Sequence, residues 1–210
     1  MNLPPMPADD FYHYRIDSNR IFSTGHGYGA MFTNALGWSR GDTLRAIGPV
    51  AGMPPNAYGR GTATGVGHVG ARIAHGENDT SVDSTTGGIA SPYFRIGQNG
   101  CSPTVTPIAT TPTGCVEYQD CQPDLPVAFC VHHEGHNWPN PRCGCDGGVC
   151  FDAGSAIWPF ITRCKQAEIS RRVGARIGAD VRVSRTLVPD RPKTTAFFSI
   201  FSSHERGDFL

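Results

Sequence analysis

The sequence predicts an α/β fold, with a mostly parallel sheet flanked by helices. Short apolar runs of strand length alternate with loops and helical patterns along the chain, as they do in α/β domains. A strand, a glycine-rich turn and a helix also follow one another directly over residues 20–38. The length of 210 residues is enough for one domain with a hydrophobic core.

The expected elements follow from apolar periodicity and from the placement of glycine and proline. Residues 1–19 are polar and aromatic and predict a short helix that ends in a turn. Residues 84–114 are expected to be mostly loop, with one poor helix. The other expected elements are strands over 20–24, 44–50, 69–74, 116–118 and 127–132, and helices over 28–38 and 153–164, the last interrupted by Pro159.

Composition excludes several classes of function. The formal net charge is zero, so no overall charge favours binding to nucleic acid or to a membrane surface. No apolar run approaches the roughly 18 residues of a transmembrane helix. The first 20 residues contain no apolar stretch of a signal peptide.

Eight cysteines, all after residue 100, favour disulfides and an oxidising compartment. The alternative is a zinc site formed by Cys143, Cys145 and Cys150 with nearby histidines. Disulfides and the lack of an export signal are in conflict. A missing natural N-terminus would resolve that conflict.

The character of the chain changes after Cys164. Residues 165–210 are rich in arginine, contain no cysteine and have weak periodicity. We expect a domain over 1–164 and a basic tail of uncertain order over 165–210. The tail lacks the interleaved aromatic residues and the motif of a nucleic-acid-binding arm.

The turn at residues 25–29 has the frame of a nucleophile elbow. Nucleophile elbows have the pattern Gly-x-Ser-x-Gly, because small residues must flank the nucleophile in this strained turn. Here Gly27 stands where the serine would be. A glycine-rich turn of this kind could also be an anion-binding loop at a helix N-terminus. The dinucleotide-binding pattern does not fit, since the third glycine comes one position early.

Two further loops each follow a predicted strand and carry candidate catalytic groups. Asp79 is placed to orient a histidine, although it could simply cap a turn. His136 lies on a glycine-containing loop and is a candidate general base. A zinc-protease motif is excluded because Asn137 stands where its second histidine would be. His132 and His133 are expected to be strand-end residues that face solvent. The order of elbow, acid and histidine is that of the α/β-hydrolases.

The ordered motifs resemble the feruloyl esterase and polyhydroxybutyrate depolymerase-like family of α/β-hydrolases, over about residues 8–163. The segments that carry the resemblance are 17–22 (DSNRIF), 25–31 (GHGYGAM), 45–52 (RAIGPVAG), 75–82 (HGENDTSV), 99–101 (NGC), 118–121 (YQDC), 135–139 (GHNWP), 151–153 (FDA) and 157–160 (IWPF). The resemblance implies the C-terminal portion of an α/β-hydrolase fold. The family's strands before the elbow strand are missing from this sequence.

Residue by residue, the resemblance implies that His136 is the general base and Asp79 its orienting acid. Gly27 occupies the nucleophile position, so no acyl-enzyme can form there. The backbone N–H of Tyr28 would contribute to the oxyanion hole, and Trp138 would line the acyl or aryl pocket. Ser23 lies outside the elbow apex and cannot replace the nucleophile.

The resemblance also implies a disulfide between Cys101 and Cys121, which leaves Cys115 near Cys130. It implies no cofactor, no metal and an extracellular carboxylic ester hydrolase, for example one that removes feruloyl groups from xylan. We expect a monomer. The alternatives are a non-catalytic relative that binds polysaccharide or an aromatic ester, and a truncated gene product. Asn78-Asp79-Thr80 is a formal glycosylation acceptor, which we expect to be unmodified because a glycan would crowd the acid.

Overall fold

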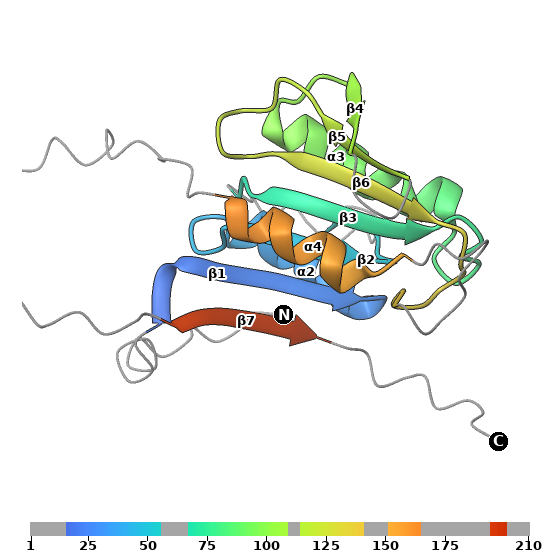
Figure 1. The fold of residues 1–210 in the computed structure, drawn as a ribbon, viewed down its shortest axis with the longest axis horizontal. Coiled ribbons are helices and arrows are strands. Elements are labelled where there is room, and N and C mark those ends of the chain that lie inside the picture. The colour runs from blue at the N-terminus through green and yellow to red at the C-terminus, as the bar shows by residue number, and fades with distance from the viewer. Residues whose placement is uncertain (1–15, 56–66, 109–113, 141–150, 165–193, 201–210) are drawn as a thin grey trace, which may run out of the picture.

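A computed structural model describes residues 16–55, 67–108, 114–140, 151–164 and 194–200 (Figure 1). These ranges form a seven-stranded sheet in the order β4-β5-β6-β3-β2-β1-β7. The strands are β1 (Ile16–His26), β2 (Ala46–Val50), β3 (Gly70–Gly76), β4 (Val105–Pro107), β5 (Cys115–Tyr118), β6 (Val127–His132) and β7 (Thr194–Ile200). The helices are α2 (Tyr28–Ser39), the π-helix η2 (Ser84–Gly88), α3 (Ala90–Asn99) and α4 (Ala153–Arg163).

The sheet is mixed, with a parallel part and an antiparallel part. β7, β1, β2, β3 and β6 run parallel to one another. β5 pairs antiparallel with β6, and β4 antiparallel with β5. The α/β class and the mostly parallel sheet expected from the sequence are confirmed. In the parallel part, the carboxyl ends of the strands meet at one edge of the sheet, where α/β proteins place their ligands.

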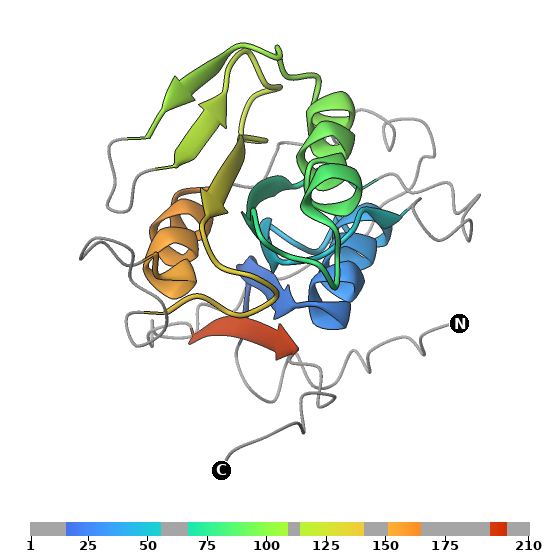
Figure 2. The ribbon, with the colours of Figure 1, turned by 90° about the vertical axis from the view of Figure 1, so that its right-hand side faces the viewer.

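Helices cover both faces of the sheet (Figure 2). α4 packs on one face, over a core that includes Phe22, Ala46 and Ala74. α2 and α3 lie on the other face, where the core includes Ile21, Ile47 and Ile73. Each residue of the second set is the sequence neighbour of one in the first, because successive side chains of a strand point to opposite faces. Strands buried on both faces explain the continuous apolar runs in the sequence.

β1 is longer than the sequence predicted. It begins at Ile16, so residues 16–19 are strand, and the predicted helix over 1–19 is wrong for that part. The remaining residues of that helix lie outside the described ranges. β1 pairs with β2 on one side and with β7 on the other. The pairing with β7 runs from Ile16 opposite Thr194 to Gly25 opposite Ile200. Pairing to a neighbouring strand extends β1 beyond its short apolar run.

Residues 84–114 contain the one helix that was predicted there, α3, but they are not mostly loop, because the π-helix η2 and the strand β4 lie in the same range. Asp83 begins the π-helix, and its carboxylate accepts hydrogen bonds from the backbone N–H groups of Thr85 and Thr86. α3 follows at once and ends at Gly100, which adopts φ +62 in the left-handed region that glycine tolerates best. The fully buried side chain of Arg95 and the buried Ile96 fix α3 against the sheet.

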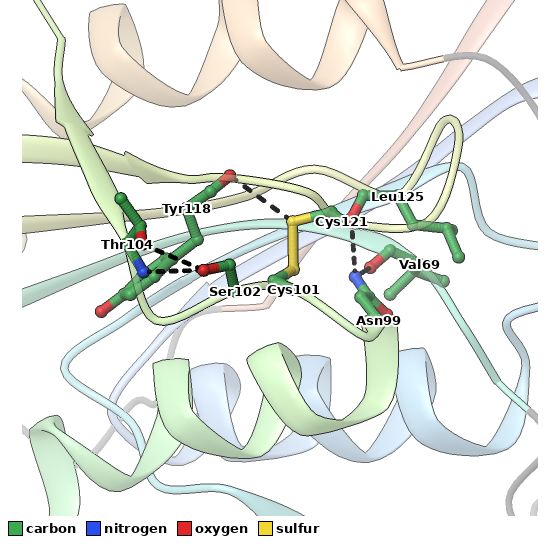
Figure 3. Close-up of a disulfide and its surroundings, with 8 residues drawn as sticks. All are labelled: Val69, Asn99, Cys101, Ser102, Thr104, Tyr118, Cys121 and Leu125. Atoms are coloured by element: carbon green, nitrogen blue, oxygen red, sulfur yellow. Dashed lines mark hydrogen bonds between the residues drawn. A yellow bond between two sulfur atoms is a disulfide. The ribbon is translucent and has the colours of Figure 1, made fainter.

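Two disulfides join the antiparallel part of the sheet to its surroundings. Cys101–Cys121 connects the end of α3 to the loop after β5, and Cys115–Cys130 joins β5 to β6. Beside the first bond, the side-chain amide of Asn99 donates to the carbonyls of Val69 and Leu125 (Figure 3). Both pairings inferred from the family resemblance are present. Cys164 is free and buried.

Several predictions fall wholly or partly outside the described ranges. Cys143, Cys145 and Cys150 are not described, so their disulfide and zinc interpretations remain predictions. Of the basic tail, the structure describes only β7, which adds a parallel strand beside β1. A strand in this segment was not expected. Among the helices of the described ranges, none combines the length and apolar character needed to span a membrane.

Candidate active site

The three candidate loops meet at the carboxyl edge of the parallel strands. Gly27 directly follows β1, Asp79 lies three residues after β3, and His136 lies four residues after β6. Although β2 and β3 separate β1 from β6 in the sheet, the loops converge above them. The convergence brings together the three positions that the sequence singled out.

Gly27 is the apex of a sharp turn between β1 and α2. It adopts φ +55 and ψ −120, a conformation that residues with a side chain rarely adopt. Its N–H donates to the carbonyl of Val50 at 3.1 Å, which fixes the turn to the end of β2. Its own carbonyl accepts the N–H of Met31 at 3.1 Å, and α2 begins at the next residue. The turn therefore has the strand–turn–helix context of a nucleophile elbow.

Asp79 is buried, with 2% of its surface exposed, and both of its carboxylate oxygens have polar partners. One carboxylate oxygen, Oδ1, accepts the N–H groups of Ser81 at 2.9 Å and Val82 at 2.8 Å. The other, Oδ2, lies 2.8 Å from His136 Nδ1 and 3.3 Å from His75 Nε2. The carboxylate therefore caps its own turn and also holds the imidazole of His136. The two readings of Asp79 that the sequence left open are compatible.

His136 presents one ring nitrogen to Asp79 and the other to Gly27. A carboxylate can only accept, so Nδ1 carries the proton and Nε2 has a free lone pair. A Cβ atom built on Gly27 would lie 3.0 Å from Nε2 and 3.5 Å from Cε1. The side chain is 21% exposed, and the ring of His26 lies beside it with centroids 4.7 Å apart. In this tautomer, Nε2 can accept a proton at the nucleophile position.

His75 is a buried neighbour of Asp79 that the sequence analysis did not assign. Its Nε2 donates to the carbonyl of Val82 at 2.8 Å, on the turn that Asp79 caps. Burial lowers the pKa of His75, chiefly by removing the charged form from water. His75 is therefore a neutral imidazole that lies against the carboxylate of Asp79. His75 is the last but one residue of a buried strand, and no sequence pattern distinguishes it there.

The acid loop and the histidine loop are joined by backbone and side-chain contacts. Glu77 N–H donates to His132 O at 2.8 Å, and Asn78 N–H donates to Glu134 O at 3.2 Å. The Asn78 side-chain amide also donates to His133 O, and the imidazole of His133 pairs with the Glu77 carboxylate. We call these four contacts the loop clamp. The clamp fixes the position from which His136 reaches Asp79.

Both His132 and His133 were predicted to face solvent. His133 does, but His132 is buried. His132 ends β6 with 5% of its surface exposed, and its ring stacks on Phe151 with centroids 5.5 Å apart. Neither ring nitrogen has a hydrogen-bond partner among the described residues. Burial is the largest cause that lowers the pKa of His132 to about 4. It is therefore a neutral packing residue beneath the site.

Tyr28, Trp138 and Ser23 complete the set of sequence candidates. Tyr28 is the first residue of α2, so its N–H lies in the electropositive first turn, while its side chain is 70% exposed. Trp138 is half-buried and packs against the core under α4. The roles of both in substrate binding stay predictions. The hydroxyl of Ser23 is buried and pairs with that of Thr33 at 3.1 Å, so it is not available as a nucleophile.

The described residues provide no cluster of metal ligands. Within the ranges that the structure describes, no group of three His, Cys, Asp or Glu side chains is arranged to hold an ion. The described polar groups at the site are an acid, imidazoles and backbone amides. These groups suit proton transfer and acyl chemistry.

Comparison with known proteins agrees with this chemistry. The chain is 34% identical over 130 residues to feruloyl esterase D of Neurospora crassa. The alignment covers 60% of this chain and 43% of that protein, so the chain spans less than half the length of its relative. No family model matches the chain. The similarity supports an esterase-like family.

Proposed function

We propose that the chain carries the acid–base half of a serine esterase site on the C-terminal portion of an α/β-hydrolase fold. Asp79 is the orienting acid and His136 the base. Gly27 occupies the nucleophile position, and the Tyr28 N–H is an oxyanion donor. Because Gly27 has no hydroxyl, ester hydrolysis through a seryl acyl-enzyme is impaired in this chain.

One observation carries this proposal. His136 donates through Nδ1 to the buried Asp79 at 2.8 Å, while its Nε2 faces the apex of the strand–helix turn. A histidine held in one tautomer by a buried carboxylate is the arrangement that removes a proton from a hydroxyl nucleophile. The glycine at the apex is what interrupts that chemistry.

The substrate class follows from the relative. The name of the Neurospora crassa protein specifies a feruloyl ester, and the two disulfides agree with an oxidising compartment. We therefore propose an extracellular protein that recognises aromatic acyl esters of plant cell-wall polysaccharide. Trp138 would line its acyl pocket, and the protein would act as a monomer without cofactor.

The test restores the missing hydroxyl with Gly27→Ser. A side chain at φ +55 costs about 1–3 kcal/mol, so folding is first checked by thermal unfolding. The new Cβ would lie 3.0 Å from His136 Nε2, and the partly exposed imidazole must move by a few tenths of an ångström. We expect a fluorophosphonate probe to label Gly27→Ser but not the natural chain. Adding His136→Gln to the variant should abolish the labelling.

A folded Gly27→Ser protein that is not labelled would contradict the proposed site. Labelling that survives His136→Gln would show that another residue is the base. The oxyanion hole can be probed separately by comparing two measurements on Gly27→Ser. Hydrolysis of methyl ferulate requires the oxyanion hole, whereas equilibrium binding of methyl ferulate does not.

The second candidate is ester binding without turnover, and the glycine at position 27 favours it. In this case the natural chain binds methyl ferulate or a feruloylated oligosaccharide and releases it unchanged. Calorimetric titration of the natural chain measures this binding. A truncated product without function would bind neither ligand.

A further inference from the structure

The ring nitrogen of His136 lies beside the place that a serine hydroxyl on residue 27 would occupy. Its Nε2 lies 3.0 Å from the position of a Cβ on Gly27, and no side-chain atom of residue 27 separates the two. Nδ1 is held by Asp79, so the lone pair on Nε2 points away from the carboxylate. An ester carbonyl placed over the turn would meet this nitrogen first.

We propose that His136 is itself a nucleophile toward activated acyl donors, namely aryl esters and thioesters. This inference rests on the proposed function, because it places an acyl donor over the same turn. It adds an activity to a site that lacks serine. Histidine is one of the side chains that form covalent intermediates in enzymes.

The first step transfers the acyl group to the ring. The Nε2 lone pair attacks the carbonyl carbon, and the bond between that carbon and the leaving oxygen or sulfur breaks, with its electron pair leaving as phenolate or thiolate. The product is an N-acylimidazolium that keeps its Nδ1 proton. Asp79 stabilises the positive charge through the 2.8 Å hydrogen bond.

The second step releases the acid. Water attacks the acyl carbon, its proton passes to solvent, and the bond from carbon to Nε2 breaks and returns the electron pair to the ring. Together the steps convert an ester and water into a carboxylic acid and a phenol. No oxidant, metal or cofactor is consumed.

The leaving group decides which esters react. In the tetrahedral intermediate, imidazole and the original leaving group compete for expulsion. An alkoxide is a far poorer leaving group than imidazole, so alkyl esters such as methyl ferulate return to starting material. A 4-nitrophenolate or a thiolate leaves readily, so the reaction goes forward. The expected substrates are therefore narrower than those of a serine esterase.

The surroundings of the turn suit this step. The N-terminus of the 12-residue helix α2 lies directly after Gly27, and its dipole favours the negative oxygen of the intermediate. The loop clamp and the two backbone bonds to Asp79 Oδ1 hold the acid–imidazole pair in place. His136 can therefore attack without first leaving Asp79.

The experiment compares two substrates that differ only in the leaving group, 4-nitrophenyl ferulate and methyl ferulate. With the ester in excess of the natural chain, we expect a burst of about one 4-nitrophenolate per protein molecule and the ultraviolet absorbance of an N-acylimidazole. Methyl ferulate should give neither. His136→Gln should abolish the burst, and Asp79→Asn should slow it by at least about tenfold, because the wrong tautomer is favoured.

His68→Gln is the matched control, since His68 lies just before β3, at the opposite end of that strand from His75. It should leave the burst unchanged. A burst that persists in His136→Gln would overturn the proposal. So would turnover without a burst and with a large deuterium solvent isotope effect, because His136 would then deprotonate water instead of attacking carbon.

The Gly27→Ser variant separates this inference from the proposed function. If a fluorophosphonate labels Gly27→Ser but the natural chain gives no burst, the esterase-type site stands and nucleophilic attack by His136 is refuted. If neither reacts, both proposals fail.

Discussion

Gly76→Ala should separate His136 from Asp79 without touching either residue. Gly76 ends β3, and a Cβ built there would lie 2.3 Å from Glu134 O and 2.5 Å from Gly135 O. Ordinary contacts begin at 3.4 Å, so the overlap with Glu134 O is 3.4 − 2.3 = 1.1 Å. Both atoms are backbone, and neither can rotate away as a side chain would. The histidine loop must therefore move by roughly an ångström.

The cost follows from what that movement breaks. The hydrogen bonds of Glu77 N–H and Asn78 N–H to the histidine loop cannot both survive a shift of this size. Overpacking of this kind costs about 1–3 kcal/mol. In a domain of this length, that corresponds to a fall in Tm of roughly 2–4 °C for each kcal/mol.

The assay pairs thermal unfolding with the NMR signal of the His136 Nδ1 proton, which is shifted downfield while it is shared with Asp79. Gly97→Ala is the matched control, because a Cβ at Gly97 has nothing within 4 Å. It lies inside α3, where alanine should stabilise by up to about 1 kcal/mol. A Gly76→Ala protein with an unchanged Tm and an unchanged Nδ1 signal would refute the role assigned to the loop clamp.

Three further outcomes are expected. Replacing both cysteines of one disulfide by serine, either Cys101 with Cys121 or Cys115 with Cys130, should lower the free energy of unfolding by about 3 kcal/mol. Urea unfolding measures this change, and Cys164→Ala is a control that removes a thiol but no disulfide. Burial lowers the pKa of His132 to about 4, so the unfolded chain binds more protons than the folded one between about pH 6.5 and about pH 4, and stability falls as the pH drops through that window. His132→Phe keeps a ring against Phe151 and should reduce this loss of stability at low pH. Urea midpoints at about pH 7 and about pH 5 measure the loss, and a loss as large as in the natural chain would assign the acid sensitivity to other groups. In the Gly27→Ser background, Asp79→Asn should reduce fluorophosphonate labelling by roughly 10⁴-fold, as expected when an orienting carboxylate no longer fixes the histidine tautomer, and undiminished labelling would mean that Asp79 only caps its turn.

The sequence predicted the parts of the fold that local pattern controls. The turn at Gly27 was visible because its glycine frame lies between a strand-length apolar run and a helical one. The loops of Asp79 and His136 were visible because each follows an apolar run, and their order matched that of the α/β-hydrolases. The Cys101–Cys121 pairing came from the resemblance, which left Cys115 near Cys130, and the spacing of the four cysteines around two predicted strands agreed with it.

The parts that the sequence missed or only weakly indicated depend on tertiary contacts. α3 contains Ser91, Pro92 and Gly97, which are poor helix formers, and it is held by the burial of Arg95 and Ile96. β1 extends to Ile16 because Ile16 pairs with Thr194 of β7, whereas its pairing with β2 begins only at Phe22.

The supporting histidine was missed for a related reason. His75 looked like an ordinary strand residue, because nothing in a linear pattern shows that Asp79 folds back to within 3.3 Å of its ring.

The position of the two disulfides has a consequence for how the protein should be produced. Cys115–Cys130 joins β5 to β6, and β6 leads directly into the loop that carries His136. Gly27 and Asp79 follow strands that contain no cysteine. Material made in a reducing cytoplasm would therefore keep the turn and the acid while loosening the strand that carries the imidazole. A negative result from such material would therefore not test the site, so assays of this chain call for expression in a periplasm or through a secretory pathway.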